Sequence, residues 1–106
     1  MFNDDIVKVN LCCVVCNVCT AVSALLTYNA ALNRPAYQSS VYNDSRGSYV
    51  ASLGNDGNRE TNATKNNKPW CSATKSETNP WWAVDLERPT TVYRVDLTNR
   101  RNGIVF

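Results

Sequence analysis

Four of the five cysteines in this 106-residue chain stand close together near its N-terminus, at positions 12, 13, 16 and 19. The spacing Cys13-x-x-Cys16-x-x-Cys19 is that of thiolate ligands in structural zinc sites. A metal site is disfavoured because residues 11–26 are continuously apolar, and because the chain has no histidine and no second ligand cluster. We interpret these cysteines as small hydrophobic residues, with a metal or redox role as the alternative.

The apolar run over residues 11–26 is too short for a confident membrane span and has the length of a signal-peptide core. Val22-Ser23-Ala24 supplies small residues near a cleavage point, although the acidic Asp4 and Asp5 ahead of the run are atypical of a signal. We predict that residues 1–27 are a secretory signal peptide. An uncleaved signal anchor, which would hold the protein at a membrane, and a sequence without a targeting role are the alternatives.

A second group of candidate ligand-binding residues is the loop Leu53-Gly54-Asn55-Asp56-Gly57-Asn58-Arg59. It combines oxygen-bearing side chains with flexible glycines. Calcium takes roughly six to eight oxygen ligands, many of them backbone carbonyls, in an irregular cage. A loop with one carboxylate can supply several of these ligands. From the residues alone, a plain Asn/Asp-Gly turn without a metal is the alternative.

Two segments after this loop are predicted to be strands, because their apolar residues alternate with polar ones. The alternation covers residues 81–87 and 93–98, and Arg88-Pro89-Thr90 separates the two segments. Their apolar faces comprise Trp82, Val84 and Leu86 in the first segment and Tyr93, Val95 and Leu97 in the second. We interpret Trp82 as a core residue rather than a platform for sugar stacking, and Trp81 as the cover of a neighbouring loop.

Charge and composition disfavour two broad classes of function. The net charge is +2, and lysine and arginine are scattered singly, so no stripe for nucleic acid is present. The chain has no histidine, no paired acidic cluster and no nucleophile elbow, so we do not expect an enzyme. Residues 38–80 are rich in Pro, Gly, Asn, Ser and Thr, as in a loop-rich all-β domain.

The amino-acid sequence of the two predicted strands resembles that of one family. Asn79-Pro80-Trp81-Trp82-Ala83-Val84-Asp85-Leu86, followed by Val92-Tyr93-Arg94-Val95-Asp96-Leu97-Thr98-Asn99-Arg100, is similar to the F-type lectin (fucolectin) domain, a relative of the discoidin or coagulation-factor type C domains. Further matches lie upstream in the same order: Ala31 to Ser40, Tyr49-Val50-Ala51-Ser52 with Asp56-Gly57-Asn58-Arg59, and Cys71-Ser72. The resemblance covers about residues 29–102.

The resemblance implies an all-β fold, a galactose-binding-like β-sandwich (jelly roll). Residues 28–106 would hold only part of such a domain, so we expect a C-terminally truncated sandwich that ends on Gly103-Ile104-Val105-Phe106. A sandwich without its last strands has open edges and an uncovered apolar face, and both favour association.

The resemblance also implies a structural Ca²⁺ in the loop described above. The matching ligands are the backbone carbonyls of Leu53, Asn58 and Trp70 and the carboxylate of Asp56. Trp70 stands where the family usually has a serine, whose hydroxyl adds a ligand. We therefore expect a partial calcium site of low affinity.

For the sugar site, the resemblance implies a histidine and two arginines that bind fucose hydroxyls. Arg100 matches the first arginine, Ala73 stands at the histidine position, and the second arginine would follow Phe106. Each missing contact should cost about 1–3 kcal/mol of binding free energy. We therefore expect a weakened site. A solvent-exposed Arg100 without a ligand is the alternative.

Cys71 is alone in the predicted mature domain. The resemblance implies a disulfide to a cysteine near the end of the domain, so we expect the partner of Cys71 to lie beyond Phe106, which would leave Cys71 to pair between chains. If the protein is secreted, Asn43 and Asn62 are acceptors for N-glycosylation, since each begins an Asn-x-Ser/Thr triplet.

The leading functional hypothesis is a secreted, extracellular, calcium-dependent lectin module of reduced affinity. It would bind fucosylated glycans or glycoproteins, as in innate immunity, and could form a homo-oligomer. The alternative is a module of the same family that no longer binds sugar and serves a structural or protein-interaction role.

Overall fold

The computed structural model describes residues 10–11, 13–20 and 23–100, and it describes side chains from residue 28 onward. The predicted all-β class is confirmed, since short strands and one 3-10 helix make up the described secondary structure. In chain order the elements are β1 (Asn10–Leu11), β2 (Cys13–Thr20), β3 (Ser23–Asn29), β4 (Ala36–Gln38), β5 (Asn43–Asp44), β6 (Gly47–Ser48), η1 (Ala51–Gly54), β7 (Thr64–Lys65), β8 (Lys68–Pro69), β9 (Ser72–Ala73), β10 (Trp82–Val84) and β11 (Arg94–Thr98).

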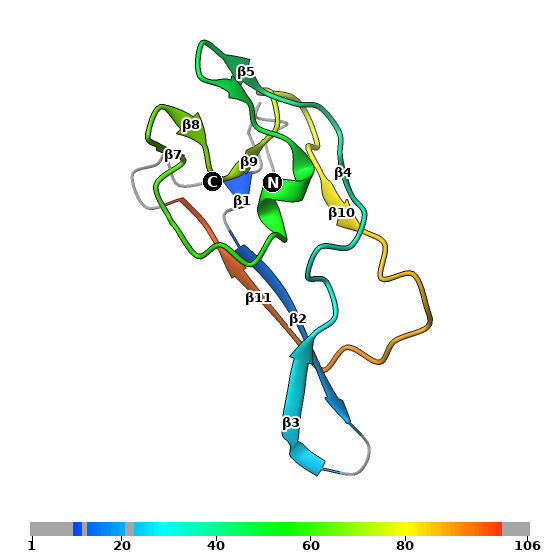
Figure 1. The fold of residues 1–106 in the computed structure, drawn as a ribbon. Coiled ribbons are helices and arrows are strands. Elements are labelled where there is room, and N and C mark those ends of the chain that lie inside the picture. The colour runs from blue at the N-terminus through cyan, green and yellow to red at the C-terminus, as the bar shows by residue number, and fades with distance from the viewer. Residues whose placement is uncertain (1–9, 12, 21–22, 101–106) are drawn as a thin grey trace, which may run out of the picture.

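The longest strands form an antiparallel sheet in the order β11-β2-β3, which runs diagonally through the lower half of Figure 1. Arg94 pairs with Asn17 and Thr98 pairs with Cys13, so the whole of β11 lies against β2. Most of the apolar segment 11–26 therefore lies in strands β1, β2 and β3. Residues 1–9 lie outside the described residues, and the removal of residues 1–27 as a signal stays a prediction.

The core lies where β10 pairs with β4 and covers the turn after β3. Trp82, Val84 and Leu86 pack against the buried residues Ala30 and Ala31, as their alternation predicts. The Trp82 indole also donates a 2.9 Å hydrogen bond from Nε1 to the Ala51 carbonyl. The interpretation of Trp82 as a core residue is confirmed.

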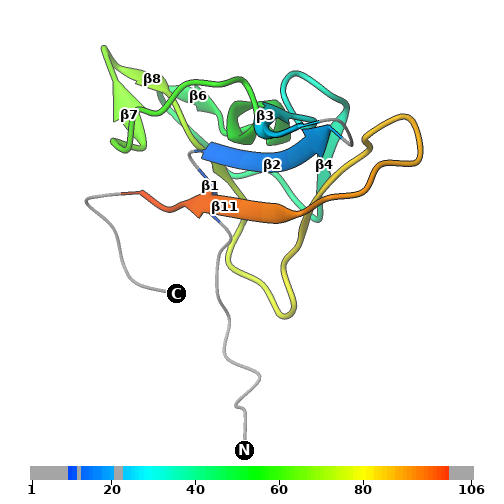
Figure 2. The ribbon, with the colours of Figure 1, turned by 90° about the horizontal axis from the view of Figure 1, so that it is seen from below.

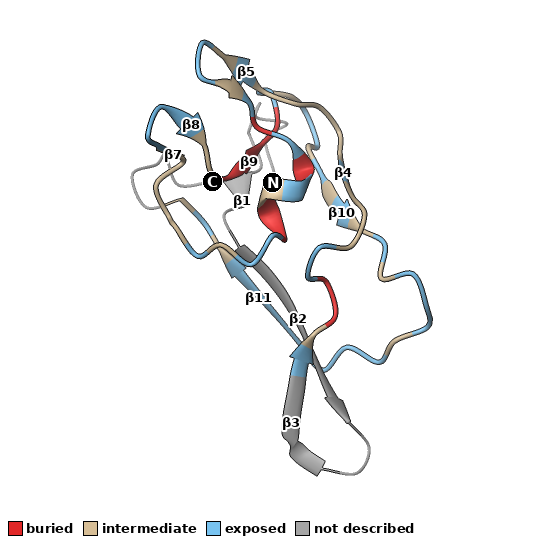
Figure 3. Cartoon of the chain, viewed as in Figure 1, coloured by how far each residue is buried: buried red, intermediate tan, exposed pale blue. Residues whose placement is uncertain are grey.

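Three shorter pairings lie to the left of β4 and β10 in Figure 1: the hairpins β5–β6 and β7–β8, and the pair of β1 with β9. Gly47 has a φ of +140°, a value that favours glycine, where the chain leaves the β5–β6 turn. Figure 3 shows buried residues at the ends of η1 and along β9.

The second predicted strand forms, as β11, but its apolar face does not meet a core. Tyr93, Val95 and Leu97 expose 55%, 52% and 64% of their surface. The expected burial of this face is therefore wrong for the described residues, because β11 is the edge strand of its sheet and no described element covers it (Figure 2). Trp81 exposes 51% of its surface, and its expected role as the cover of a neighbouring loop stays a prediction.

Among the residues that the structure describes, no helix has the length and apolar character to cross a membrane.

Candidate functional site

A polar pocket of about 130 Å³ lies between the two hairpins, β9 and the end of β11. This volume is well below the roughly 300 Å³ at which small-molecule sites usually begin, so the pocket can hold one edge or one substituent of a larger ligand. Eight residues line the pocket: Tyr42, Asp44, Arg46, Tyr49, Ala63, Thr64, Ala73 and Arg100.

The floor of the pocket is a closed network of backbone hydrogen bonds. The amide of Tyr42 donates to the Ala73 carbonyl at 2.9 Å, the amide of Ala73 donates to the Tyr49 carbonyl at 3.1 Å, and the amide of Tyr49 donates to the Tyr42 carbonyl at 2.9 Å. Gln38 Nε2 donates to the carbonyls of Tyr49 and Ala73 at 2.9 and 3.0 Å. Because Tyr49 and Ala73 are buried, the floor is rigid.

One wall is built on the turn of the β5–β6 hairpin, where Asp44 and Arg46 form an ion pair. The backbone amide of Arg46 donates to Asp44 Oδ1 at 2.8 Å, and Arg46 Nη2 donates to Oδ2 at 2.9 Å. Tyr49 donates its hydroxyl proton to the same Oδ2 at 2.9 Å. Both carboxylate oxygens of Asp44 are therefore occupied by donors from this chain.

These contacts set the ionisation of the wall. The side-chain hydrogen bond from Arg46 holds the pKa of the Asp44 carboxyl below its usual value, and the same bond raises the pKa of Arg46. Burial, with the hydrogen bond to Asp44 second, raises the pKa of Tyr49 to about 12. At neutral pH the wall thus holds one carboxylate, one guanidinium and one neutral phenol.

Arg100, which follows soon after β11 ends, also lines the pocket. Its Nε is buried and has no hydrogen-bond partner among the described residues. The structure therefore brings Arg100 and Ala73, the two positions predicted for sugar binding, into the same pocket. The binding of a sugar between them stays a prediction.

Sequence reasoning missed Asp44, Arg46 and Tyr49 as pocket residues. Asp44 and Arg46 stand two positions apart in an Asp-Ser-Arg-Gly turn, which predicts their local contact. Nothing in the sequence places that turn beside Arg100, because the two segments meet only through the tertiary fold.

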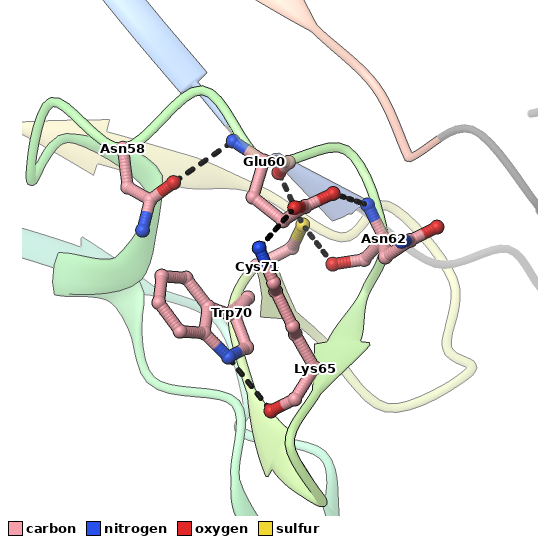
Figure 4. Close-up of polar contacts among 6 residues, drawn as sticks. All are labelled: Asn58, Glu60, Asn62, Lys65, Trp70 and Cys71. Carbon is pink, nitrogen blue, oxygen red and sulfur yellow. Dashed lines mark hydrogen bonds and ion pairs between the residues drawn. The ribbon is translucent and has the colours of Figure 1, made fainter.

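The predicted calcium ligands occupy two neighbouring parts of the structure. Leu53, Asp56 and Asn58 lie in η1 and the loop after it, whereas Trp70 follows β8. Asp56 Oδ1 accepts a 2.9 Å hydrogen bond from the Asn58 amide, and Asn58 Oδ1 accepts one of 2.9 Å from the Glu60 amide (Figure 4 draws the second). Trp70 is fixed by its Nε1, which donates to the Lys65 carbonyl at 2.8 Å.

These oxygens fit calcium in kind but not in charge. Asp56 supplies the single carboxylate of the loop 53–58, and the part of the chain that the structure describes holds no group of three or more His, Cys, Asp or Glu side chains suited to a metal. Calcium sites gain affinity from the number of charged ligands. The donor set therefore fits a weak site.

Asn55 was not among the predicted ligands, yet it is the most constrained residue of the loop. It exposes 1% of its surface, and its Nδ2 donates to the carbonyls of Ala31 and Arg34 at 2.7 and 2.9 Å. Its Oδ1 is buried without a hydrogen-bond partner in the described part of the chain. The signal in the sequence was an asparagine between two glycines, which sequence reasoning read only as part of a turn.

Residues 53–104 match the family model described as the NedA-like, galactose-binding domain of the F5/F8 type C group. The match supports a discoidin-like domain. The galactose-binding-like fold class is therefore confirmed, and the finer assignment to the F-type lectins stays a prediction. The chain has no significant match among curated proteins or among solved structures.

One prediction needs correction: Cys71 is not a lone cysteine. Cys71 is disulfide-bonded, whereas its partner was expected beyond Phe106. Its sulfur lies 3.7 Å from the carbonyl oxygens of Glu60 and Asn62 (Figure 4), and these are contacts, because a disulfide sulfur carries no proton. The other four cysteines of the chain all lie within residues 12–19, whose side chains the structure does not describe.

Both predicted glycosylation sites flank the pocket. Asp44 follows Asn43 and lines the pocket, and Ala63 and Thr64 follow Asn62 and do the same. Asn43 is exposed, and Asn62 is half-buried. Their modification stays a prediction, and a glycan on either residue would stand at the pocket rim.

Proposed function

We propose that this protein is a carbohydrate-binding module whose ligand enters the pocket between the β5–β6 hairpin and Arg100. The main support for this proposal is that Arg100 and Ala73 line the same pocket, which also contains fixed charged and hydroxyl groups. Arginine is suited to sugars because its planar donors can bind two neighbouring oxygens. The match to a galactose-binding domain supports the same class of ligand.

Fucose is the ligand that the sequence resemblance implies, and we propose fucosylated glycans or glycoproteins as the first ligands to test. Ala73 offers no side-chain hydrogen bond where the family has a histidine. We therefore expect weak binding, as in a module that has lost part of its original site. No catalytic role is proposed.

Calcium is proposed as a structural ion rather than a direct ligand of the sugar. Asp56 and the carbonyls of Leu53, Asn58 and Trp70 would hold it, and bound calcium would stabilise the loop after η1. The Oδ1 atom of Asn55 is buried and has no donor among the described residues. A cation bound in this loop would give that oxygen a partner, which supports the proposed calcium site. Calcium should raise the unfolding temperature of the protein, magnesium should not, and Asp56→Asn should abolish the calcium effect.

Secretion is proposed on two observations. The disulfide of Cys71 supports an oxidising compartment, because such bonds form and persist mainly there. The two Asn-x-Ser/Thr triplets are accessible to glycosylation only along the secretory route.

A glycan array probed with the full chain, with and without a calcium chelator, tests the proposed function. We expect weak, selective binding that Ala63→Leu removes, since a larger side chain on the wall fills the pocket. Ser76→Leu is the matched control, because Ser76 is exposed and does not line the pocket. A folded protein that binds no glycan on the array would overturn the proposal.

The exposed apolar face of β11 favours a second candidate function, protein interaction. Tyr93, Val95 and Leu97 form this face, and a second copy of the chain is the first partner to test. Sedimentation at increasing concentration should then show an oligomer that Leu97→Asn disperses. A monomer at all concentrations would remove the homo-oligomer from consideration.

A further inference from the structure

We propose that the pocket selects saccharides that carry a carboxylate, and that Arg100 binds that carboxylate. This inference rests on the proposed carbohydrate-binding function and specifies its ligand class. It differs from the neutral fucose that the sequence resemblance implies.

The first argument is the balance of hydrogen-bond donors and acceptors. A neutral sugar presents hydroxyls, which donate as well as accept, so its sites usually combine both kinds of protein group. Asp44 is the only carboxylate among the described residues that line the pocket. Both its oxygens already accept hydrogen bonds from Arg46, with Tyr49 as a further donor to Oδ2. The Arg100 guanidinium can only donate. The charged groups of the pocket therefore favour a ligand that accepts.

The second argument is charge. Asp44 and Arg46 neutralise one another across 2.9 Å. The positive charge of Arg100 is then left without a counter-charge among the described residues that line the pocket. The Nε of Arg100 is buried and has no partner among the described residues, so it has lost water without gaining a hydrogen bond. A guanidinium in this state favours a carboxylate, whose two oxygens match its planar donors.

The third argument is size. A volume of about 130 Å³ cannot enclose a whole oligosaccharide, so one substituent must carry the recognition. Ala73 contributes to this space because it has no long side chain, and the backbone network with Tyr42 and Tyr49 keeps the floor from collapsing. A planar carboxylate on a sugar ring is of the size that such a pocket admits.

The test compares three ligands of nearly equal shape, with the full chain in solution: methyl α-galacturonoside, its neutral methyl ester and methyl α-galactoside. We expect the galacturonoside to bind at least about tenfold more tightly than the other two, because charge-assisted hydrogen bonds are roughly twice as strong as neutral ones. Added salt should weaken the galacturonoside alone. Nuclear magnetic resonance titration of the backbone amides measures all three affinities and shows whether the pocket is the binding site.

Arg100→Gln should abolish the preference for the galacturonoside, and Arg100→Lys should restore part of it. Arg88→Gln is the matched control: it removes the same charge from an exposed loop residue outside the pocket, and it should leave the preference intact. If Arg100→Gln fails to fold, the comparison of the acid with its ester on the unchanged protein still decides the proposal.

The outcomes separate this inference from the proposed function. Equal or tighter binding of the galactoside would overturn the carboxylate preference and support carbohydrate binding. Binding of acetate as tight as that of the galacturonoside would also overturn it, because the pocket would then be a simple anion site. Failure of all three ligands alongside other glycans that bind overturns only the inference, and failure of every glycan overturns both.

Discussion

The Tyr49 hydroxyl donates a 2.9 Å hydrogen bond to Oδ2 of Asp44, the oxygen that Arg46 Nη2 also contacts at 2.9 Å. Tyr49 is buried in the pocket floor, whereas Asp44 ends β5 and Arg46 lies in the turn of the β5–β6 hairpin. This bond therefore fixes a surface turn to the rigid floor. The orientation of Arg46 in the pocket depends on it.

Tyr49→Phe removes the hydroxyl and leaves the ring in place. We expect the free energy of unfolding to fall by about 1 kcal/mol, the usual net value of one hydrogen bond. The pKa of Asp44 should also rise toward its ordinary value, because one donor to its carboxylate is lost. Urea denaturation and a carboxyl titration by nuclear magnetic resonance measure the two effects. Tyr37→Phe, in an exposed residue of β4, is the control and should change neither quantity.

Acid should weaken the pocket wall in a defined direction. The folded protein lowers the pKa of Asp44 below its ordinary 3.8, through the side-chain hydrogen bond from Arg46 first. The folded state therefore favours the charged carboxylate. Its contribution to stability is present in full well above pH 3.8 and is lost as the pH falls through the lowered folded value.

Urea denaturation at a series of acidic pH values measures this loss. Asp44→Asn should make the stability of the protein less dependent on pH in that range. A residual dependence should remain from Glu77, whose pKa is lowered by hydrogen bonds from Ser39 first and then Ser40. The assignment to Asp44 is wrong if Asp44→Asn retains the full acid dependence of the unchanged protein.

The alternation of residues predicted the part of the fold that is decided locally. Trp82, Val84 and Leu86 lie on the core side, as a period of two predicts, because β10 has a partner strand and a packed layer behind it. Val95 and Leu97 follow the same pattern and are exposed. Alternation shows which residues share a face, and the arrangement of the other elements decides whether that face is covered.

The candidate site was only partly predictable for a similar reason. Arg100 and Ala73 were found through the resemblance of their motifs to a known family. The Asp44–Arg46 pair lies more than 50 positions before Arg100 in the chain, and its approach to Arg100 depends on the tertiary fold. No local sequence pattern predicts that these residues line the same pocket.

Position 54 requires a glycine because its backbone lies close to the indole of Trp82. A Cβ added at Gly54 would lie 3.1 Å from Trp82 Nε1 and 3.2 Å from Cε2. The indole cannot easily retreat, because Nε1 is bonded to the Ala51 carbonyl. Gly54→Ala should lower the free energy of unfolding by about 1–3 kcal/mol, a typical cost of overpacking. Ser52→Ala, in the exposed neighbour within η1, should have little effect on the denaturation midpoint.

The disulfide of Cys71 makes a prediction about the N-terminal segment. All other cysteines lie within residues 12–19, so an intrachain bond requires that this segment stay attached to the domain. Peptide mapping without reduction should therefore recover Cys71 linked to an N-terminal peptide, and reduction should separate the two. A purified protein that begins after residue 27, with a free Cys71, would show instead that the segment is removed as a signal.

Asn55 connects the loop after η1 to the turn after β3. Substitutions should show how much its amide nitrogen contributes to stability. Its Nδ2 donates to the carbonyls of Ala31 and Arg34, and the residue is 1% exposed. Asn55→Ala leaves both carbonyls without that donor and should cost about 1–3 kcal/mol of unfolding free energy.

Asn55→Asp should cost more than Asn55→Ala at neutral pH, because it places a buried carboxylate against the carbonyl oxygens of Ala31 and Arg34. Burial raises the pKa of such a carboxyl in the folded state, so protonation stabilises the fold, and the penalty should shrink as the pH falls through the raised value. Urea denaturation at neutral and mildly acidic pH measures this reversal. Equal losses for both substitutions at both pH values would contradict the extra penalty expected for a buried carboxylate at this position.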